Sequence, residues 1–181
     1  MPKRNILELL TGGDRRSIGR ADEVAAAVSK NLALFPALMK GWWSEDPLVR
    51  MRTADATEKI TRNKPHLLGP YRRELLGLMA EAKQRELRWH LAAMVPRLPL
   101  DVKERRVASS LLRSYLEDDS SIVKTSALQA LADLAADQAS IHLEIIELLR
   151  QSARKGTPAM KARSRKLLLH LERGVTRNPT P

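Results

Sequence analysis

The sequence predicts an all-α protein built from stacked pairs of helices. Apolar residues recur at helical spacing along most of the chain, and one helical pattern returns every 36 to 38 residues. No stretch shows the alternation of apolar and polar residues that is typical of a half-buried strand. We therefore expect helices and no sheet.

The repeated pattern is clearest in segments set in register. They are DPLVRMRTADATEKI (46–60), QRELRWHLAAMVPRL (84–98), SSIVKTSALQALADL (120–134) and TPAMKARSRKLLLHL (157–171). The fourth position of each segment is apolar and the fifth position is basic. The basic residues are Arg50, Arg88, Lys124 and Lys161. We interpret each segment as the inner helix of a helix pair.

The apolar stretches between these segments predict the outer helices, over residues 32–43, 66–80, 101–116 and 140–152. Asp46, Ser120 and Thr157 precede inner helices and are residue types favoured as N-caps. Pro96 lies inside the second inner helix, where it should produce a kink.

The two ends differ from the repeats. We expect capping helices over 1–31, including one helix over 17–31, and about four helix pairs over 32–173. Residues 174–181 contain glycine and prolines with little to bury, so we expect a disordered tail there.

The repeated pattern resembles the HEAT-repeat family, whose inner helices typically open with an aspartate in the turn followed by Val-Arg. The resemblance implies a right-handed α-α superhelix, a solenoid of antiparallel helix pairs. The chain is also similar to uncharacterised bacterial HEAT-repeat proteins of this length, which carry an opening like TGGDRRSIGRADEV. That similarity implies a fold and no particular activity.

In the HEAT-repeat family, the basic residues and the turn acids form a ladder of hydrogen bonds between neighbouring repeats. The resemblance therefore implies a structural role for Arg50, Arg88, Lys124, Lys161, Asp46 and Asp118. We expect the lysine ammonium of Lys124 to reach the carboxylates of its own turn. The ladder is incomplete in the sequence, because no acid precedes Lys161 in the turn RKGTP.

The composition narrows the function classes. The chain has no cysteine, which excludes disulfides, thiol catalysis and cysteine-ligated metals. No apolar run approaches the roughly 20 residues that span a bilayer, and the first residues do not resemble a signal peptide. We expect a cytoplasmic protein with no membrane contact. The formal net charge of +11 attracts anionic partners in general, nucleic acid among them.

Enzymatic and metal-binding signatures are weak. His66, His90, His142 and His170 lie in different predicted helices without metal-ligand spacing, so we expect no metal, no cofactor and no catalysis. A remote alternative is a DNA glycosylase of the HEAT-like kind, which uses tryptophan and aspartate on its concave face. Trp42 and Asp46 have a suitable spacing of four, but Asp46 is also the expected N-cap.

Two clusters of cations are candidate phosphate contacts. The last repeat supplies Arg154, Lys155, Lys161 and Arg165, and a glycine-rich turn near the start supplies Arg15 and Arg16. Each cluster also fits a solvated surface or a plain turn. Nucleic-acid binding through phosphate contacts is therefore the alternative function.

The function that the sequence predicts is a non-catalytic, monomeric scaffold that binds a protein partner of unknown identity through its inner helices. The candidate partner-binding residues are Trp43, at the rim of a turn, and the inner-helix residues Arg52, Asp55, Lys59, His90, Arg163 and Lys166.

Overall fold

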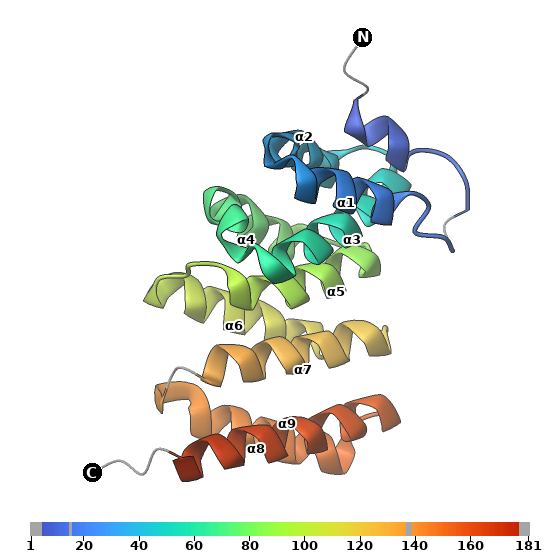
Figure 1. Ribbon diagram of the computed structural model, residues 1–181. Helices are drawn as coiled ribbons and strands as arrows, with labels where there is room; N and C mark the ends of the chain where they lie inside the picture. Colours follow the sequence, from blue (N-terminus) through green and yellow to red (C-terminus); the bar gives the residue numbers. More distant parts are fainter. Residues whose placement is uncertain (1–4, 15, 137–138, 178–181) are drawn as a thin grey trace.

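A computed structural model describes residues 5–14, 16–136 and 139–177. All regular structure within these ranges is helical, and they contain no strand. Figure 1 shows the helices stacked one below another from the N-terminus to the C-terminus. The expectation of an all-α protein is therefore confirmed.

The described elements follow one another along the chain as α-helices and short 3-10 helices, the latter marked η. They are η1 (Ile6–Leu10), α1 (Ala21–Lys30), η2 (Leu32–Leu34), α2 (Phe35–Met39), η3 (Lys40–Trp43), α3 (Pro47–Asn63), η4 (Pro65–Tyr71), α4 (Arg72–Glu81), α5 (Arg85–Met94), η5 (Val95–Arg97), α6 (Val102–Tyr115), α7 (Ser121–Ala136), α8 (Ala139–Lys155) and α9 (Pro158–Arg177).

The long helices form pairs. Helices α1, α3, α5, α7 and α9 make one row in which each helix packs against the next, and Figure 1 shows this row from α1 down to α9. Helices α2, α4, α6 and α8 pack against α3, α5, α7 and α9, respectively. We call the first set the inner row and the second the outer row.

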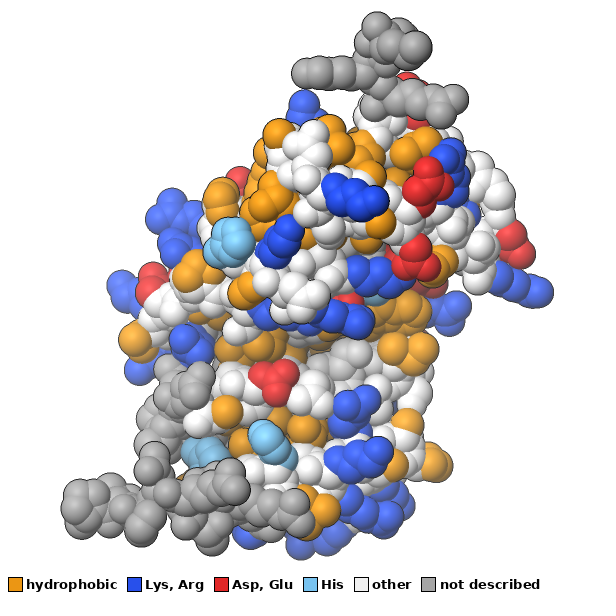
Figure 2. All heavy atoms as spheres, viewed as in Figure 1, with side chains coloured by type: hydrophobic (Ala, Val, Ile, Leu, Met, Phe, Trp, Pro, Cys, Tyr) orange, Lys and Arg blue, Asp and Glu red, His pale blue; other side chains and the backbone are white. Residues whose placement is uncertain are grey.

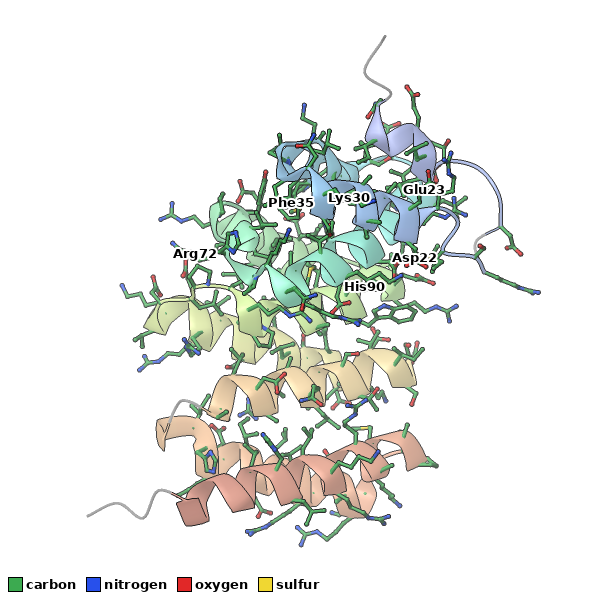
Figure 3. All side chains as sticks on the ribbon, viewed as in Figure 1. Asp22, Glu23, Lys30, Phe35, Arg72 and His90 are labelled. Atoms are coloured by element: carbon green, nitrogen blue, oxygen red, sulfur yellow. The ribbon has the colours of Figure 1, made fainter. Side chains whose placement is uncertain are left out.

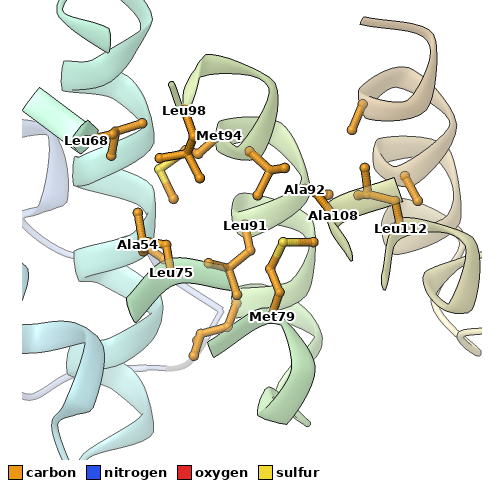
Figure 4. Close-up of a cluster of buried hydrophobic side chains, with 14 of the residues drawn as sticks. Ala54, Leu68, Leu75, Met79, Leu91, Ala92, Met94, Leu98, Ala108 and Leu112 are labelled. Carbon is orange, nitrogen blue, oxygen red and sulfur yellow. The ribbon is translucent and has the colours of Figure 1, made fainter. Parts of the chain in front are cut away.

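The core lies between the two rows and consists almost entirely of aliphatic side chains. Figure 4 shows part of it, where Leu75 and Met79 of α4 meet Leu91 of α5 and Leu112 of α6. Burying each such side chain stabilises the fold by about 2 kcal/mol. Helix α7 buries eight residues, four of them alanines, and these small side chains let its neighbours approach closely.

Several helix boundaries differ from the sequence predictions. The helix expected over 17–31 begins only at Ala21, because residues 17–19 form a turn in which the Ser17 hydroxyl accepts a 3.0 Å hydrogen bond from the Gly19 amide. Gly19 has a φ of +54°, in the left-handed region that glycine adopts readily.

Proline accounts for another difference. Helix α5 ends at Met94 and continues as the 3-10 helix η5, which contains Pro96, so the expected kink is a change of helix type. At the C-terminal end, α9 continues to Arg177, so the disordered tail expected from residue 174 is wrong for its first four residues. Residues 178–181 lie outside the described residues.

Two of the expected N-caps are observed. The Asp46 carboxylate accepts a 2.8 Å hydrogen bond from the Leu48 amide at the start of α3. The Thr157 hydroxyl accepts a 3.3 Å bond from the Met160 amide at the start of α9. These bonds satisfy amides that have no partner inside the helix.

Candidate binding surface

The inner row exposes a face with both signs of charge, which we call the inner face. Its polar side chains come from all five helices of the row, and they are Asp22, Asp55, Lys59, Arg62, His90, Gln129, Asp133, Arg163, Lys166 and His170. Figure 3 shows Asp22 on α1 and His90 on α5 on this side of the molecule, with α3 between them. Figure 2 shows acidic and basic side chains interspersed here.

Lys59 of α3 links the first two helices of the row. Its ammonium donates to Asp22 of α1 and, at 2.7 Å, to Asp55 one turn earlier on α3. Partial burial lowers the pKa of Lys59, but the hydrogen bonds to the two carboxylates outweigh that effect and raise it above its ordinary value. The lysine is therefore firmly charged and fixed in place.

Glu58 links α3 to the end of α5. Its side chain is buried, with 5% of its surface exposed. Arg62 and Arg97 each approach its carboxylate to 2.6 Å. Burial raises the pKa of Glu58, but the hydrogen bonds from the two arginines outweigh it and hold the pKa below its ordinary value. Removing Glu58 would leave two guanidinium groups without their acid.

His90 of α5 is half-buried beside this network, and its ring packs edge-on against Trp89 at 5.5 Å between centroids. Burial lowers the pKa of His90 to about 4, although Asp55 and Glu58 oppose the shift. The imidazole is therefore neutral at pH 7. It can donate or accept a hydrogen bond but adds no charge to the inner face.

The prediction that Arg52 contacts a partner is wrong. Only 2% of the residue is exposed. Its guanidinium donates to the backbone carbonyl oxygens of Leu10, Gly12, Asp14 and Ser17 at 2.6–3.3 Å. Arg52 therefore ties the loop between η1 and α1 to α3 and is unavailable to a partner.

The spacing of residues in the sequence could have indicated that Arg52 is buried. Val49, Arg52, Thr53, Ala56 and Thr57 are spaced so that they form one helical stripe, and all five are buried. The stripe places Arg52 on the core side of α3.

The remaining candidates for partner binding lie apart. Arg163 and Lys166 are exposed on α9, and Arg163 donates a 3.0 Å hydrogen bond to Gln129 of α7. Trp43 is 50% exposed and lies at the turn before α3, while its neighbour Trp42 is fully buried and donates to the Thr57 hydroxyl. The structure thus brings Asp55, Lys59 and His90 together, places Arg163 and Lys166 farther along the same row, and puts Trp43 at the edge.

The expected ladder exists in a different register at its first two positions. Arg50 donates to the carbonyl oxygens of Ser44 and Glu45 and to the amide oxygen of Gln84 in the next turn. Arg88 donates to Ala82 at 2.7 Å and pairs with Asp118 of the next turn at 2.5 Å. Each arginine therefore joins its own turn to the following one.

The last two ladder positions lack such links. Lys124 and Lys161 are half-buried and have no side-chain hydrogen bond or ion pair with any described residue. The pairing of Lys124 with its own turn is thus not observed. The register explains the absence, because the following turn, RKGTP, contains no acid.

The candidate phosphate contacts have mostly free side chains. Lys155, Arg165 and Arg16 are exposed, and Arg154 makes a 3.4 Å contact with Glu147. Arg15 lies outside the described residues. The side chains of Lys155, Arg165 and Arg16 make no hydrogen bond or ion pair with any described residue.

Other site types find little support. The buried Trp42 ring cannot contact a ligand, and the Asp46 carboxylate caps α3, so this pair does not form the arrangement of the glycosylase alternative. Within the described ranges there is no group of three acidic or histidine side chains arranged to hold a metal ion. None of the described helices is long and apolar enough to cross a membrane.

Comparison with known proteins adds no function. No protein-family model matches the chain. No curated protein matches it either.

Sequence reasoning missed Asp22, Glu58, Arg62 and Arg97 as members of the charged network. Glu58 and Arg62 are four residues apart on one predicted helix, a spacing that favours an ion pair and could have indicated their contact. The contacts of Asp22 and Arg97 depend on how neighbouring helices pack, which no local spacing predicts.

Proposed function

We propose that the protein is a non-catalytic scaffold whose inner face binds a protein partner. We also propose that its helix pairs stack as a right-handed superhelix of the HEAT-repeat kind. The observation that carries the function is the mixed charge of the inner face, where cross-helix hydrogen bonds already hold Lys59 and Arg163 in place.

Two physical arguments support a protein partner. Side chains held in position before binding lose less conformational entropy when a partner docks, so more of the contact energy is retained. A face that alternates acids and bases complements another protein surface of mixed charge, and it repels wrongly charged partners. A polyphosphate backbone offers only negative charge and would meet Asp22, Asp55 and Asp133.

Nucleic-acid binding is a second candidate, favoured by the charge of the last repeat. Residues 154–173 contain seven basic residues and one acid. Lys161, Arg165 and Lys166 make no described ion pair, which leaves them available to phosphates. Such binding should lose affinity steeply with salt, because counterions are released from the nucleic acid.

A pair of matched charge reversals tests the main proposal. The inner-face variant is Arg163→Glu with Lys166→Glu, and the control is Lys103→Glu with Arg106→Glu on outer helix α6. All four positions are exposed. Proteins that co-purify with the tagged chain are quantified by mass spectrometry for the wild type and both variants.

We expect the amount of a specific co-purifying partner to fall at least tenfold in the inner-face variant and to stay the same in the control. Equal loss in both variants would contradict a role for the inner face. Anisotropy titrations with duplex DNA, single-stranded DNA and RNA over a salt series test the second candidate. Micromolar affinity that weakens steeply with salt and disappears in Lys161→Glu with Arg165→Glu would favour nucleic acid.

A further inference from the structure

A second surface runs along the turns that precede α3, α5 and α7. Three neighbouring clefts there share the side chain of Lys83, and we call them together the edge groove. Their volumes are about 690, 490 and 360 Å³. The groove is separate from the inner face, because none of the inner-face residues lines it.

One part of the groove has an apolar wall. The 360 Å³ cleft is lined by Trp43 together with Leu78, Ala82 and Leu87, and also by the polar side chains of Arg50, Glu81, Lys83 and Gln84. Trp43 is half exposed, and its neighbour Trp42 anchors the turn through the buried bond to Thr57. A rigid turn that presents an exposed indole beside aliphatic side chains is suited to receive an apolar side chain.

The adjoining part is cationic. The 690 Å³ cleft is lined by Arg16, Arg50, Lys83 and Arg85, with Glu86 as its acid. Arg50 is already bound to the turn, and Arg85 contacts Glu86 at 3.2 Å. Arg16 and Lys83 are exposed and have no side-chain partner among the residues described. This part of the groove therefore has positive charge left for a ligand.

The far part carries acids. The 490 Å³ cleft adds Glu117, Asp118 and Asp119 from the turn before α7. Asp118 is bound by Arg88, while Glu117 and Asp119 are exposed. A strand of nucleic acid would bring phosphates toward these carboxylates, which disfavours a uniformly charged polyanion. A peptide can place a different charge at each position.

We propose that the edge groove binds an extended segment of a protein partner, with an apolar side chain of that segment against Trp43, its carboxylates against Arg16, Lys83 and Arg85, and a basic side chain beside Glu117 and Asp119. Neighbouring packed helices are about 10 Å apart, so a segment of about six extended residues would reach across the three turns. The proposal rests on the proposed protein-binding function for its class of ligand, but it uses a different surface.

The test begins with a phage-displayed library of random twelve-residue peptides, selected on the full chain. We expect the enriched peptides to combine an apolar residue with nearby aspartate or glutamate. A fluorescein-labelled copy of the most enriched peptide is then titrated by anisotropy. Binding of the unlabelled peptide should shift the tryptophan emission of the wild type to shorter wavelength, and the shift should be absent in Trp43→Phe.

Three variants locate the binding. Lys83→Glu with Arg85→Glu should lower the affinity for the labelled peptide at least tenfold, and Trp43→Ala should lower that affinity about tenfold. The control, Lys103→Glu with Arg106→Glu on α6, should stay within twofold of the wild type. Circular dichroism and urea unfolding of each variant verify that lost binding is not lost folding.

Other results would overturn the proposal. It fails if the selection enriches no acidic-apolar pattern, or if the peptide keeps its affinity in Lys83→Glu with Arg85→Glu. It also fails if a twelve-nucleotide dT strand binds the wild type and is lost in that variant, because the occupant would then be nucleic acid. The affinity for the selected peptides should be unchanged in Arg163→Glu with Lys166→Glu. Failure of the edge groove is therefore distinguishable from failure of the inner face.

Discussion

The two ends of the helix row are held together by different interactions. Around α3, buried or half-buried charged groups make the connections: Arg52 to the first loop, Lys59 to α1, and Glu58 to Arg97. Around α7 the buried surface is aliphatic, and Lys124 pairs with no described residue. The exposed bond between Arg163 and Gln129 links α7 to α9.

This difference separates two uses of charge. In the N-terminal half, the side chains of Arg50, Arg52, Lys59 and Arg88 bind groups of the protein itself and fix its shape, whereas Arg16 and Lys83 have no partner among the described residues. In the last repeat, the side chains of Lys155, Lys161, Arg165 and Lys166 have no such partner and remain available to a ligand.

The largest expected effect comes from Arg52. Arg52→Met should lower the free energy of unfolding by about 3 kcal/mol, because several backbone carbonyls lose charged hydrogen bonds in a buried setting. Urea unfolding followed by circular dichroism measures the change. The exposed Arg16→Met is the matched control and should change stability by less than about 0.5 kcal/mol. Equal effects would contradict the assigned role of Arg52.

Glu58→Gln should cost about 2 kcal/mol at pH 7, because two arginines lose the carboxylate that they share. The pKa of Glu58 is lowered in the folded protein, so its stabilisation is present above the unfolded value of about 4.3 and is lost as the pH falls through the folded value. Unfolding measured from pH 7 to pH 3 should show a shallower acid dependence in Glu58→Gln. An unchanged dependence would show that the Glu58 carboxylate does not hold the two arginines.

The ladder offers a direct comparison of the two halves. Arg88→Met should destabilise the protein by about 1.5 kcal/mol, since it breaks the bonds to Ala82 and Asp118. Lys124→Met, at the equivalent position, should change stability by less than about 0.5 kcal/mol. A similar cost for both substitutions, measured by urea unfolding, would mean that the second half has a ladder that the structure does not show.

The last prediction concerns the pH dependence that His90 contributes rather than the cost of a substitution. Its folded pKa is about 4, below the unfolded value of about 6.5, so the unfolded chain binds the proton more readily between these values. The free energy of unfolding should therefore fall as the pH decreases from 6.5 to 4. The charged groups that face the His90 ring are Asp55, Glu58, Lys59 and Arg62. An NMR titration should place the His90 midpoint near pH 4. A midpoint near 6.5 would show that the ring is not desolvated.

The sequence predicted the helical class and the four inner segments because a repeating apolar period directly reflects which residues face a core. It predicted a ladder between neighbouring repeats but not the register in which Arg50 and Arg88 make their links. Arg50 and Arg88 bind the turn that follows, so their partners depend on the stacking of neighbouring helices. The assignment of Arg52 to the surface failed because an arginine was assumed to be solvated, although its position on α3 matched the buried stripe.

Whether the inner face binds a protein partner can be tested by site-specific photo-crosslinking in cells that produce the full chain. A photoreactive amino acid replaces Lys166 on the inner face or Lys103 on outer helix α6. We expect a discrete protein adduct from position 166 and none from position 103. Adducts to nucleic acid at position 166, or protein adducts only from position 103, would contradict the binding of a protein partner by the inner face.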